Sequence, residues 1–342
     1  MARVERSNGS ATIIDVAREA GVSYATVSRV INNKAHVKPE KRAAVLEAMQ
    51  RLGYVVNQQA RSLAGGRSHI IGLLVQDLIS SWMGRIIRGI DEELVNAQYD
   101  LMLYTSHRRK AAEASYAAAI SRGLADGVLL IIPRNVTAYI GSLREQSFPH
   151  VLIDCNLGDR LSHSVEVANW EGAYQATTYL IGLGHRQIGF VTGQLEMESG
   201  RDRLAGFQAA LHDHGIQLDP SLIIEGNYLQ QRGFEAGQQL LSRPDRPTAI
   251  FASNDASAFG VMDAAHAHGL RLPDDLSILG FDDIPEAASI HPALTTVRQP
   301  LEQMGRIGTQ ILIRALDDPD MPIARVVLPT ELIVRRSCIR IE

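Results

Sequence analysis

The residues near the N-terminus with the clearest potential for chemistry are Tyr24, Ala25, Ser28 and Arg29. Helical spacing would put all four on the outward face of one short helix. An arginine in that place can donate two hydrogen bonds to a guanine edge, and a tyrosine ring or an alanine methyl can contact base edges or thymine methyls. These residue types at this spacing therefore favour a surface that reads DNA sequence.

Residues 12–32 predict the two helices that would position this surface. The first helix would begin after Thr12, which can cap it, and would end at Gly21, which can adopt a left-handed backbone. Ser23 can cap the second helix. The apolar residues of both helices repeat at helical spacing and would point inward: Ile13, Val16, Ala17, Ala20, Val27, Val30 and Ile31. The pattern is typical of a helix-turn-helix, whose second helix enters the major groove.

A third helix would complete a DNA-binding domain of residues 1–56. It would have Pro39 in its first turn and end near Leu52, and its apolar stripe would be Ala43, Leu46, Ala48 and Met49. Phosphate contacts fix the register of a protein on DNA without reading sequence. The residues best placed for such contacts are Thr12, Ser23, Thr26 and Asn32.

The distribution of charge separates the same region from the rest of the chain. Residues 1–68 hold eleven Lys and Arg against five Asp and Glu, whereas the remaining residues hold 23 against 33. A basic arm ahead of an acidic body favours a polyanionic partner for the arm alone. The length of 342 residues also predicts two or three domains.

The strings Asp15–Ser23, Thr26–Asn32 and Leu52–Tyr54 resemble the lactose/galactose-repressor (LacI/GalR) family of bacterial transcriptional regulators. One departure is Lys38, which stands where the family usually has a serine that caps the third helix. The resemblance implies that residues 57–68 are a hinge helix and linker, which forms on operator DNA and pairs across a dimer axis. It adds four residues to the expected DNA contacts: His36, Asn57, Ala60 and Leu63, the last as an apolar wedge in the minor groove.

From His69 onward, β-branched runs alternate with helical segments such as Trp82–Gln98. This alternation predicts an α/β fold, with parallel sheets covered by helices on both faces, and the length predicts two such lobes. The expected strands are Ile70–Val75, Asp100–Thr105, Gly127–Ile132, Val151–Asp154, Ile188–Thr192, Leu222–Glu225, Ala249–Ser253 and Leu276–Gly280.

The body, residues 69–342, resembles the core of the same family, which is similar to periplasmic sugar-binding proteins. The matching strings are Leu183–Arg186, Arg203–Phe207, Asn254–Asp255, Gly280–Asp283 and Leu294–Val297. The resemblance implies three crossings between the lobes, which we place near Val165–Ala168, Ala293–Thr296 and Leu328–Glu331. The first lobe would then hold residues 69–166 and 295–328, and the second residues 167–294 and 329–342.

Polar residues stand where the expected strands of the body end, which is where open α/β sheets bind their ligands. Carboxylates and an arginine can each grip two sugar hydroxyls, and an aromatic ring can stack on the C–H surface of a sugar. The resemblance implies an effector pocket made of Trp82, Met83, Asp154, Arg203, Tyr228, Asn254 and Asp282. One departure is Ala168 before Asn169, where the family commonly has Asp before Asn.

No set of residues predicts catalysis, a metal site or a cofactor. His212 with His214 and His266 with His268 are spaced i, i+2, which points the two side chains of each pair to different sides of a helix. Cys155 and Cys338 are expected to be reduced thiols. The N-terminus lacks the apolar stretch of a signal peptide and no segment is apolar enough to span a membrane, so we expect a cytoplasmic protein.

These observations predict a homodimeric repressor of sugar-utilisation genes, which binds a palindromic operator and responds to a small sugar or glycoside held between the lobes. Four alternatives stay open at this point. The effector could be a purine or nucleoside, and the regulator could be an activator. The body could serve as a sugar-binding protein without a DNA role, or as a sugar-processing enzyme fused to a DNA-binding module.

Overall fold

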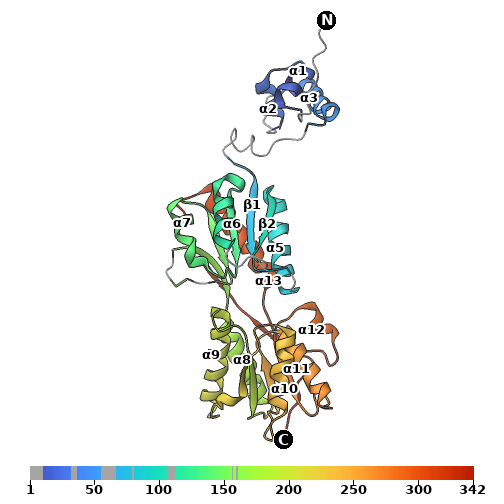
Figure 1. Cartoon of the computed structure of the whole chain (residues 1–342), viewed down its shortest axis with the longest axis vertical. Helices are drawn as coiled ribbons and strands as arrows, with labels where there is room; N and C mark the ends of the chain where they lie inside the picture. Colours follow the sequence, from blue (N-terminus) through green and yellow to red (C-terminus); the bar gives the residue numbers. More distant parts are fainter. Residues whose placement is uncertain are drawn as a thin grey trace. The chain divides into compact units, whose positions relative to one another are not determined.

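A computed structural model describes residues 11–31, 37–54, 67–78, 81–106, 112–155, 157–158 and 161–342. The chain forms two compact units, Met1–Ser68 and His69–Glu342. The first unit is helical, and the second contains two sheets with helices around each (Figure 1). No helix in the described part of the chain is long and apolar enough to cross a membrane.

In its described residues, the first unit contains three helices, α1 (Ile13–Glu19), α2 (Tyr24–Ile31) and α3 (Pro39–Leu52). Thr12 and Asp15 form a reciprocal cap at the start of α1, which satisfies two main-chain N–H groups that the helix itself leaves free. Gly21 adopts a left-handed backbone, φ 64°, and turns the chain into α2. The helix-turn-helix predicted from the sequence is therefore present.

The apolar stripe predicted for α3 is wrong in two positions. Leu46 is 53% exposed and Ala43 is also exposed, whereas Val45 and Ala48 are fully buried. The helix carries apolar residues on both sides, and the inward side is the one that packs against Val16 of α1 and Val27 of α2. Lys38 makes no side-chain cap at the start of α3, and Pro39 begins the helix.

The second unit contains two sheets of six strands each. The order in the first lobe is β11-β5-β4-β3-β1-β2, and the order in the second lobe is β12-β10-β9-β8-β6-β7. All described pairings are parallel except that of β10 with β12. The strands are β1 (Ile70–Val75), β2 (Asp100–Thr105), β3 (Gly127–Ile131), β4 (His150–Ile153), β5 (His163–Val167), β6 (Ile188–Thr192), β7 (Ile223–Glu225), β8 (Ala249–Ala252), β9 (Ser277–Asp282), β10 (Thr295–Arg298), β11 (Arg325–Leu328) and β12 (Glu331–Ile333).

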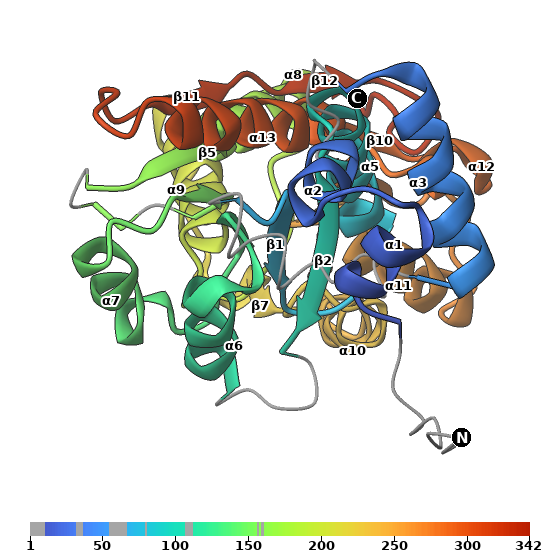
Figure 2. The same cartoon turned by 90° about the horizontal axis from the view of Figure 1, so that it is seen from above.

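Helices cover both faces of each sheet, as the alternation in the sequence predicts. In the first lobe, α5 and α13 cover one face and α6 and α7 the other (Figure 2). In the second lobe, α10 and α11 cover one face and α8 and α9 the other. The helices of this unit are α5 (Ser81–Ala97), α6 (Glu113–Ala119), α7 (Ile140–Glu145), α8 (Asn169–Gly182), α9 (Glu198–Asp213), α10 (Gln230–Leu241), α11 (Asp255–Ala267), α12 (Pro285–Ser289) and α13 (Leu301–Asp317).

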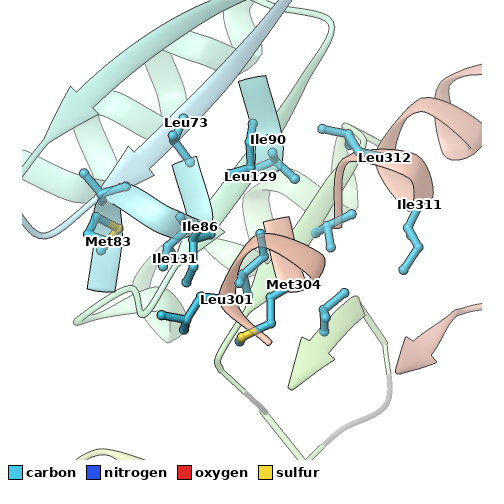
Figure 3. Packing of buried hydrophobic residues seen from close by; sticks show 14 of the residues in the cluster. Leu73, Met83, Ile86, Ile90, Leu129, Ile131, Leu301, Met304, Ile311 and Leu312 are labelled. Atoms are coloured by element: carbon cyan, nitrogen blue, oxygen red, sulfur yellow. The ribbon is translucent and has the colours of Figure 1, made fainter. Parts of the chain in front are cut away.

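The helices α5 and α13 pack closely over the first sheet. Their apolar side chains, among them Ile86 and Met304, interdigitate with Leu73 and Leu129 of the strands (Figure 3). A Cβ added to Gly305 would lie 2.1 Å from the main-chain oxygen of Ile86, and one added to Gly89 would overlap the main-chain oxygen of Glu302. These glycines allow the two helix backbones to pack in direct contact.

The chain passes between the lobes three times, and the second crossing lies later than we expected. Thr295–Arg298 is β10, which pairs with β9 and β12 in the second lobe rather than belonging to the first. The crossing to the first lobe occurs at Gln299 and Pro300, just before α13. The other two crossings fall at Ala168 and between β11 and β12.

Among the described residues, two hydrogen bonds join α5 to the second lobe. Ser81 Oγ, at the start of α5, donates to Glu286 Oε1 of α12 at 2.6 Å. Arg85 Nη1, one turn further along α5, donates to the main-chain oxygen of Asp283 at 3.2 Å. The first turn of α5 therefore lies against the segment that follows β9.

Candidate functional site

The outward face of α2 carries the side chains predicted to read DNA. Tyr24 is 53% exposed, and Ala25 and Arg29 are also exposed, whereas Ser28 is half-buried. The opposite face holds Val27 and Val30, which are buried in the core of the unit. The buried face of α2 therefore packs on the core of the unit, and its exposed face presents an aromatic ring, a methyl group and a guanidinium to solvent.

The hydroxyl groups predicted to contact phosphates are engaged in helix caps. Thr12 Oγ1 donates to Asp15 Oδ2 at 2.7 Å and accepts from the Asp15 N–H at 3.3 Å. Ser23 Oγ accepts from the Thr26 N–H at 3.2 Å and lies 2.9 Å from Thr26 Oγ1. A phosphate contact by these hydroxyls would have to be shared with the caps.

Five further residues named as DNA contacts lie outside the described residues: Asn32, His36, Asn57, Ala60 and Leu63. Their roles, including that of Leu63 as a wedge, stay predictions. The described part of the hinge segment begins at Arg67.

The second candidate site is built around Arg203, a buried residue in the second turn of α9. Its Nε donates to Asn169 Oδ1 at 2.9 Å, and its Nη1 donates to the main-chain oxygen of Ser253 at 2.5 Å. The same Nη1 lies 3.5 Å from Asp282 Oδ1, and the guanidinium stacks on the ring of Phe281, 3.8 Å from its centre. Arg203 therefore links the ends of β8 and β9 with the start of α8.

Tyr228 and Asn254 lie beside this arginine. The ring of Tyr228 is 5.7 Å from the Arg203 guanidinium, and its hydroxyl lies 3.2 Å from Ser199 Oγ. Asn254 Oδ1 caps α11 by accepting from the Ser257 N–H, while its Nδ2 donates to the main-chain oxygen of Tyr228 at 3.1 Å. Asn254 thus fixes the segment that carries the tyrosine.

Asp154 reaches the same group from the first lobe, directly after β4. Burial raises its pKa, and the charge of Arg203 and a hydrogen bond with Asn169 oppose that rise. Asn169 therefore bonds to both charged residues, one from each lobe. It stands at the first crossing, where the sequence departs from the family pattern only in the preceding Ala168.

Acidic side chains outnumber the arginine in this site. Burial raises the pKa of Asp282 to about 7, although Arg203 pulls it down. The pKa of Asp255 is raised well above its usual value by burial and by Asp282, although the Thr296 hydroxyl and the Ile284 N–H both donate to its carboxylate. A buried site with several acidic groups favours a ligand with hydroxyl groups, because carboxyl oxygens accept hydrogen bonds and a protonated carboxyl group also donates one.

Trp82 and Met83 lie near the start of α5, and their assignment to the effector pocket stays a prediction. Met83 is 5% exposed and belongs to the apolar core of the first lobe, and the half-buried Trp82 packs against that core. Both stand between Ser81 and Arg85, the two residues of α5 that bond to the second lobe. Trp82 therefore lies next in the chain to residues that contact the second lobe, and Met83 packs in the core of the first lobe.

Sequence reasoning did not assign roles to three residues that touch Arg203 or Asp282. In the sequence, Asn169 stands out only through a family pattern, and Phe281 lies within a string that matches the family. Gln299, whose Nε2 donates to Asp282 Oδ1 at 2.6 Å, is not among the pocket residues predicted from the sequence. The signal that could have found it is its place directly after β10, at the carboxyl end of a strand.

In the described part of the chain, no His, Cys, Asp and Glu side chains group to hold a metal ion.

Comparison with known protein families gives two matches. Residues 12–57 match the family described as bacterial regulatory proteins, lacI family. Residues 177–338 match a periplasmic binding protein-like domain. The first match covers the helix-turn-helix, and the second covers α9, β8 and β9, which hold most of the residues around Arg203.

Similar proteins span almost the whole chain. The probable HTH-type transcriptional repressor ExuR of Bacillus subtilis is 32% identical over 96% of this chain and 99% of its own length. The HTH-type transcriptional repressor PurR of Escherichia coli O139:H28 is 35% identical over 96% of both.

Two solved structures are similar over the same extent. The lac repressor dimer bound to operator and the anti-inducer ONPF has a TM-score of 0.86 at 28% identity, covering 97% of this chain and all of that one. The complex of the transcriptional regulator CelR with cellobiose has a TM-score of 0.74 at 31% identity, covering 96% of this chain and 99% of that one. The helix-turn-helix, the two-lobed body and these relatives agree, and the chain belongs to the lacI family of bacterial regulatory proteins.

Proposed function

We propose that this chain is a transcriptional repressor whose affinity for a palindromic operator is controlled by a small sugar or glycoside bound between its lobes. The proposed effector site rests on the group formed by Arg203, Asp282 and Asp154. Asp154 and Asp282 stand at the carboxyl ends of β4 and β9, and Arg203 of α9 lies beside Asp282. The two carboxylates can each accept from two hydroxyls, and the tyrosine ring beside Arg203 offers a face to the C–H surface of a sugar.

The proposed reader of the operator is α2, with Tyr24, Ala25, Ser28 and Arg29 at base edges. One such helix reads half of a palindromic site, so two chains are needed, and we propose a homodimer joined through the two-lobed body. The lac repressor relative is a dimer on operator DNA, which supports this proposal. The role also requires the chain to act in the compartment that holds the DNA.

A regulatory role rather than turnover fits the pocket as well. The polar groups around Arg203 bond to each other, which suits a binding site. The similar proteins ExuR and PurR are transcriptional repressors. We therefore propose that the ligand is bound and released unchanged.

Two linked measurements test the proposal. Thermal-shift screening of the full chain against neutral sugars, glycosides, purines and nucleosides identifies the effector class, and selection from fragmented genomic DNA identifies the operator. We expect a sugar or glycoside to raise the melting temperature and to change operator affinity in fluorescence anisotropy. A purine or nucleoside as the only active compound would replace the sugar, and Trp82 would then be the ring expected to stack on the base.

Variants separate the pocket from the DNA reader. Asp282→Asn should remove the thermal shift caused by the active sugar and leave operator binding intact, because Asp282 and α2 belong to different units. The matched control is Asp275→Asn, since Asp275 pairs with Arg271 away from the site. An unchanged thermal shift in Asp282→Asn would remove the pocket assignment. Light scattering that shows a monomer with operator DNA present would contradict the dimer.

A further inference from the structure

Two buried histidines stand at the amino-terminal edge of the first sheet, which is the edge opposite the proposed pocket. His150 begins β4 and His163 begins β5, and they are 8% and 9% exposed. The two strands are parallel neighbours, so these first residues lie close together. The chain also enters the sheet at this edge, because β1 begins at Ile70 and runs parallel to the others. The proposed function uses neither histidine.

The hydrogen bonds of His150 hold its ring in the neutral form. Nδ1 lies 2.8 Å from the main-chain oxygen of Phe148, which can only accept, so Nδ1 carries a proton. Nε2 lies 2.9 Å from Ser162 Oγ. Arg144 donates to the same hydroxyl oxygen from Nε at 3.2 Å and from Nη2 at 2.8 Å, which uses both of the oxygen's lone pairs. The hydroxyl therefore donates its own proton to Nε2 of His150.

A second proton on His150 would have no acceptor in this arrangement. Nε2 would become a donor that faces an oxygen already occupied by Arg144, and the two positive charges would repel each other. Burial lowers the pKa of His150 below the usual 6.5, and the charges of Arg144 and His163 add to this effect, although the bond to Phe148 opposes it. Protonation of His150 therefore requires Arg144 to leave Ser162.

His163 holds the start of the edge strand β11 by a bond of the same kind. Its Nδ1 accepts from the main-chain N–H of Ala324, directly before β11, at 2.9 Å. The main-chain oxygen of Ala324 accepts from the N–H of Ser164 at 3.0 Å, so the bond lies at the first rung between β5 and β11. A protonated Nδ1 would turn a donor toward another donor and break it. Burial lowers the pKa of His163 below 6.5 as well.

The charged groups on the elements around the two rings give the protonated forms little support. They are Arg144 and Glu145 of α7, Asp126 before β3, Glu166 of β5, Arg325 of β11, and Arg314, Asp317 and Asp318 at the end of α13. Glu166 and Arg325 pair with each other at 3.5 Å. Within the described ranges, neither ring has a hydrogen bond to a carboxylate.

We propose that His150 and His163 form a proton-operated latch at the amino-terminal edge of the first lobe. The neutral rings close the edge, and their protonation releases Arg144 from Ser162 and the start of β11 from β5. The stabilisation is fully present above pH 6.5, the ordinary pKa of histidine, and is lost as the pH falls below it, because the open edge binds the protons more tightly. The latch needs neither the effector nor the operator, so it stands apart from the proposed function.

Hydrogen–deuterium exchange of the full chain at pH 7.5 and pH 5.5 tests the latch at Ala324. Mass spectrometry of segment 320–328 gives an exchange rate, which is divided by the intrinsic rate of the same sequence at each pH. With a pKa of 6.5 in the open edge, one histidine increases the open share by up to roughly tenfold between these pH values. We expect the corrected exchange rate of the parent to rise toward that factor.

A variant that keeps the bond but cannot titrate isolates His163. The side-chain oxygen of His163→Asn stands where Nδ1 stood and can accept from Ala324, so this variant should lose most of the rise in exchange at pH 5.5. The matched control is His266→Asn, which changes an exposed histidine of α11 and should behave as the parent does. A corrected rate that does not change with pH in the parent, or an equal rise in His163→Asn, would overturn the proposal.

Nuclear magnetic resonance of the parent with ¹⁵N-labelled histidine keeps the test open if His163→Asn does not fold. At pH 7.5 the ring proton should be on Nδ1 of His150 and on Nε2 of His163. The signals of His150 are identified by their loss in His150→Gln, whose side-chain oxygen can replace Nε2 as the acceptor for Ser162. A proton on Nε2 of His150 at pH 7.5, or a ring that is half-charged above pH 6.5, would contradict the latch.

Discussion

Asp282 should make the stability of this protein depend on pH in a way that one substitution removes. Burial raises its pKa from the usual 3.8 to about 7. A raised carboxyl pKa means that the folded chain binds the proton more tightly than the unfolded chain does. The contribution to the free energy of unfolding is then fully present below pH 3.8, and it is lost as the pH rises through 7.

The size of this effect follows from the two pKa values. A rise from 3.8 to about 7 corresponds to about 4 kcal/mol in total. About 3 kcal/mol of that amount falls between pH 5 and pH 8.5. Asp282→Asn cannot titrate, so the free energy of unfolding of the variant minus that of the parent should be about 3 kcal/mol larger at pH 8.5 than at pH 5.

Urea unfolding of the parent and the variant at both pH values measures this difference. Asp275→Asn is the matched control, because hydrogen bonds from Arg271 lower the pKa of Asp275 to about 2 and it stays ionised at both pH values. Its effect on the free energy of unfolding should be the same at pH 5 and pH 8.5. If the effect of Asp282→Asn is also the same at both, Arg203 offsets the burial of Asp282, and the reasoning about an excess of buried carboxylate is refuted.

Three further substitutions test other parts of the molecule. Arg29→Ala should cost about 1–3 kcal/mol of specific operator binding and spare most non-specific binding; equal losses on all DNA in competition assays would make Arg29 a phosphate contact. Leu63→Gly should reduce operator affinity and the bend of bound DNA in circular-permutation gel shifts. Gly305→Ala should lower the free energy of unfolding by roughly 1 kcal/mol or more, the cost of overpacking, because the methyl would collide with the backbone of Ile86. The control Gly84→Ala should not lower the free energy of unfolding, because nothing lies within 4 Å of the added methyl.

The fold of the second unit was predictable because its central strands are buried and form short continuous apolar runs, such as Ile70–Val75 and Ile188–Thr192, which coincide with β1 and β6. The edge strand β2 is only half-buried, and its β-branched and apolar residues between two helical segments predicted it. The place of the second crossing was not predictable, because the sequence of Thr295–Arg298 is compatible with a strand in either sheet. Only the pairing with β9 and β12 assigns it to the second lobe.

The candidate site was predictable where it depends on strand ends and unpredictable where it depends on contacts across the fold. Asp154 and Asn254 follow strands and Asp282 ends one, so the pattern predicted their places at strand ends, while the family resemblance supplied the prediction that the two lobes bring them together. The bond between Gln299 and Asp282 joins the ends of neighbouring strands, and its existence depends on a register that the sequence does not display. Met83 is a core residue because its turn of α5 faces the sheet, which a family pattern cannot reveal.

The bonds already made by Arg203 change how the pocket should be understood. Its Nε and Nη1 are engaged by Asn169 and Ser253, and its flat face lies on Phe281. A guanidinium held on three sides in this way has little freedom to follow a ligand, so it acts mainly as a fixed positive charge that orients Asp282 and stabilises Asp154. The carboxylates, with acceptor sites to spare, are then the groups that select the ligand. Discrimination between sugars should therefore depend on which hydroxyls reach Asp154 and Asp282, and variants at these two positions should change the order of preferred sugars, whereas changes at Arg203 should weaken all of them together.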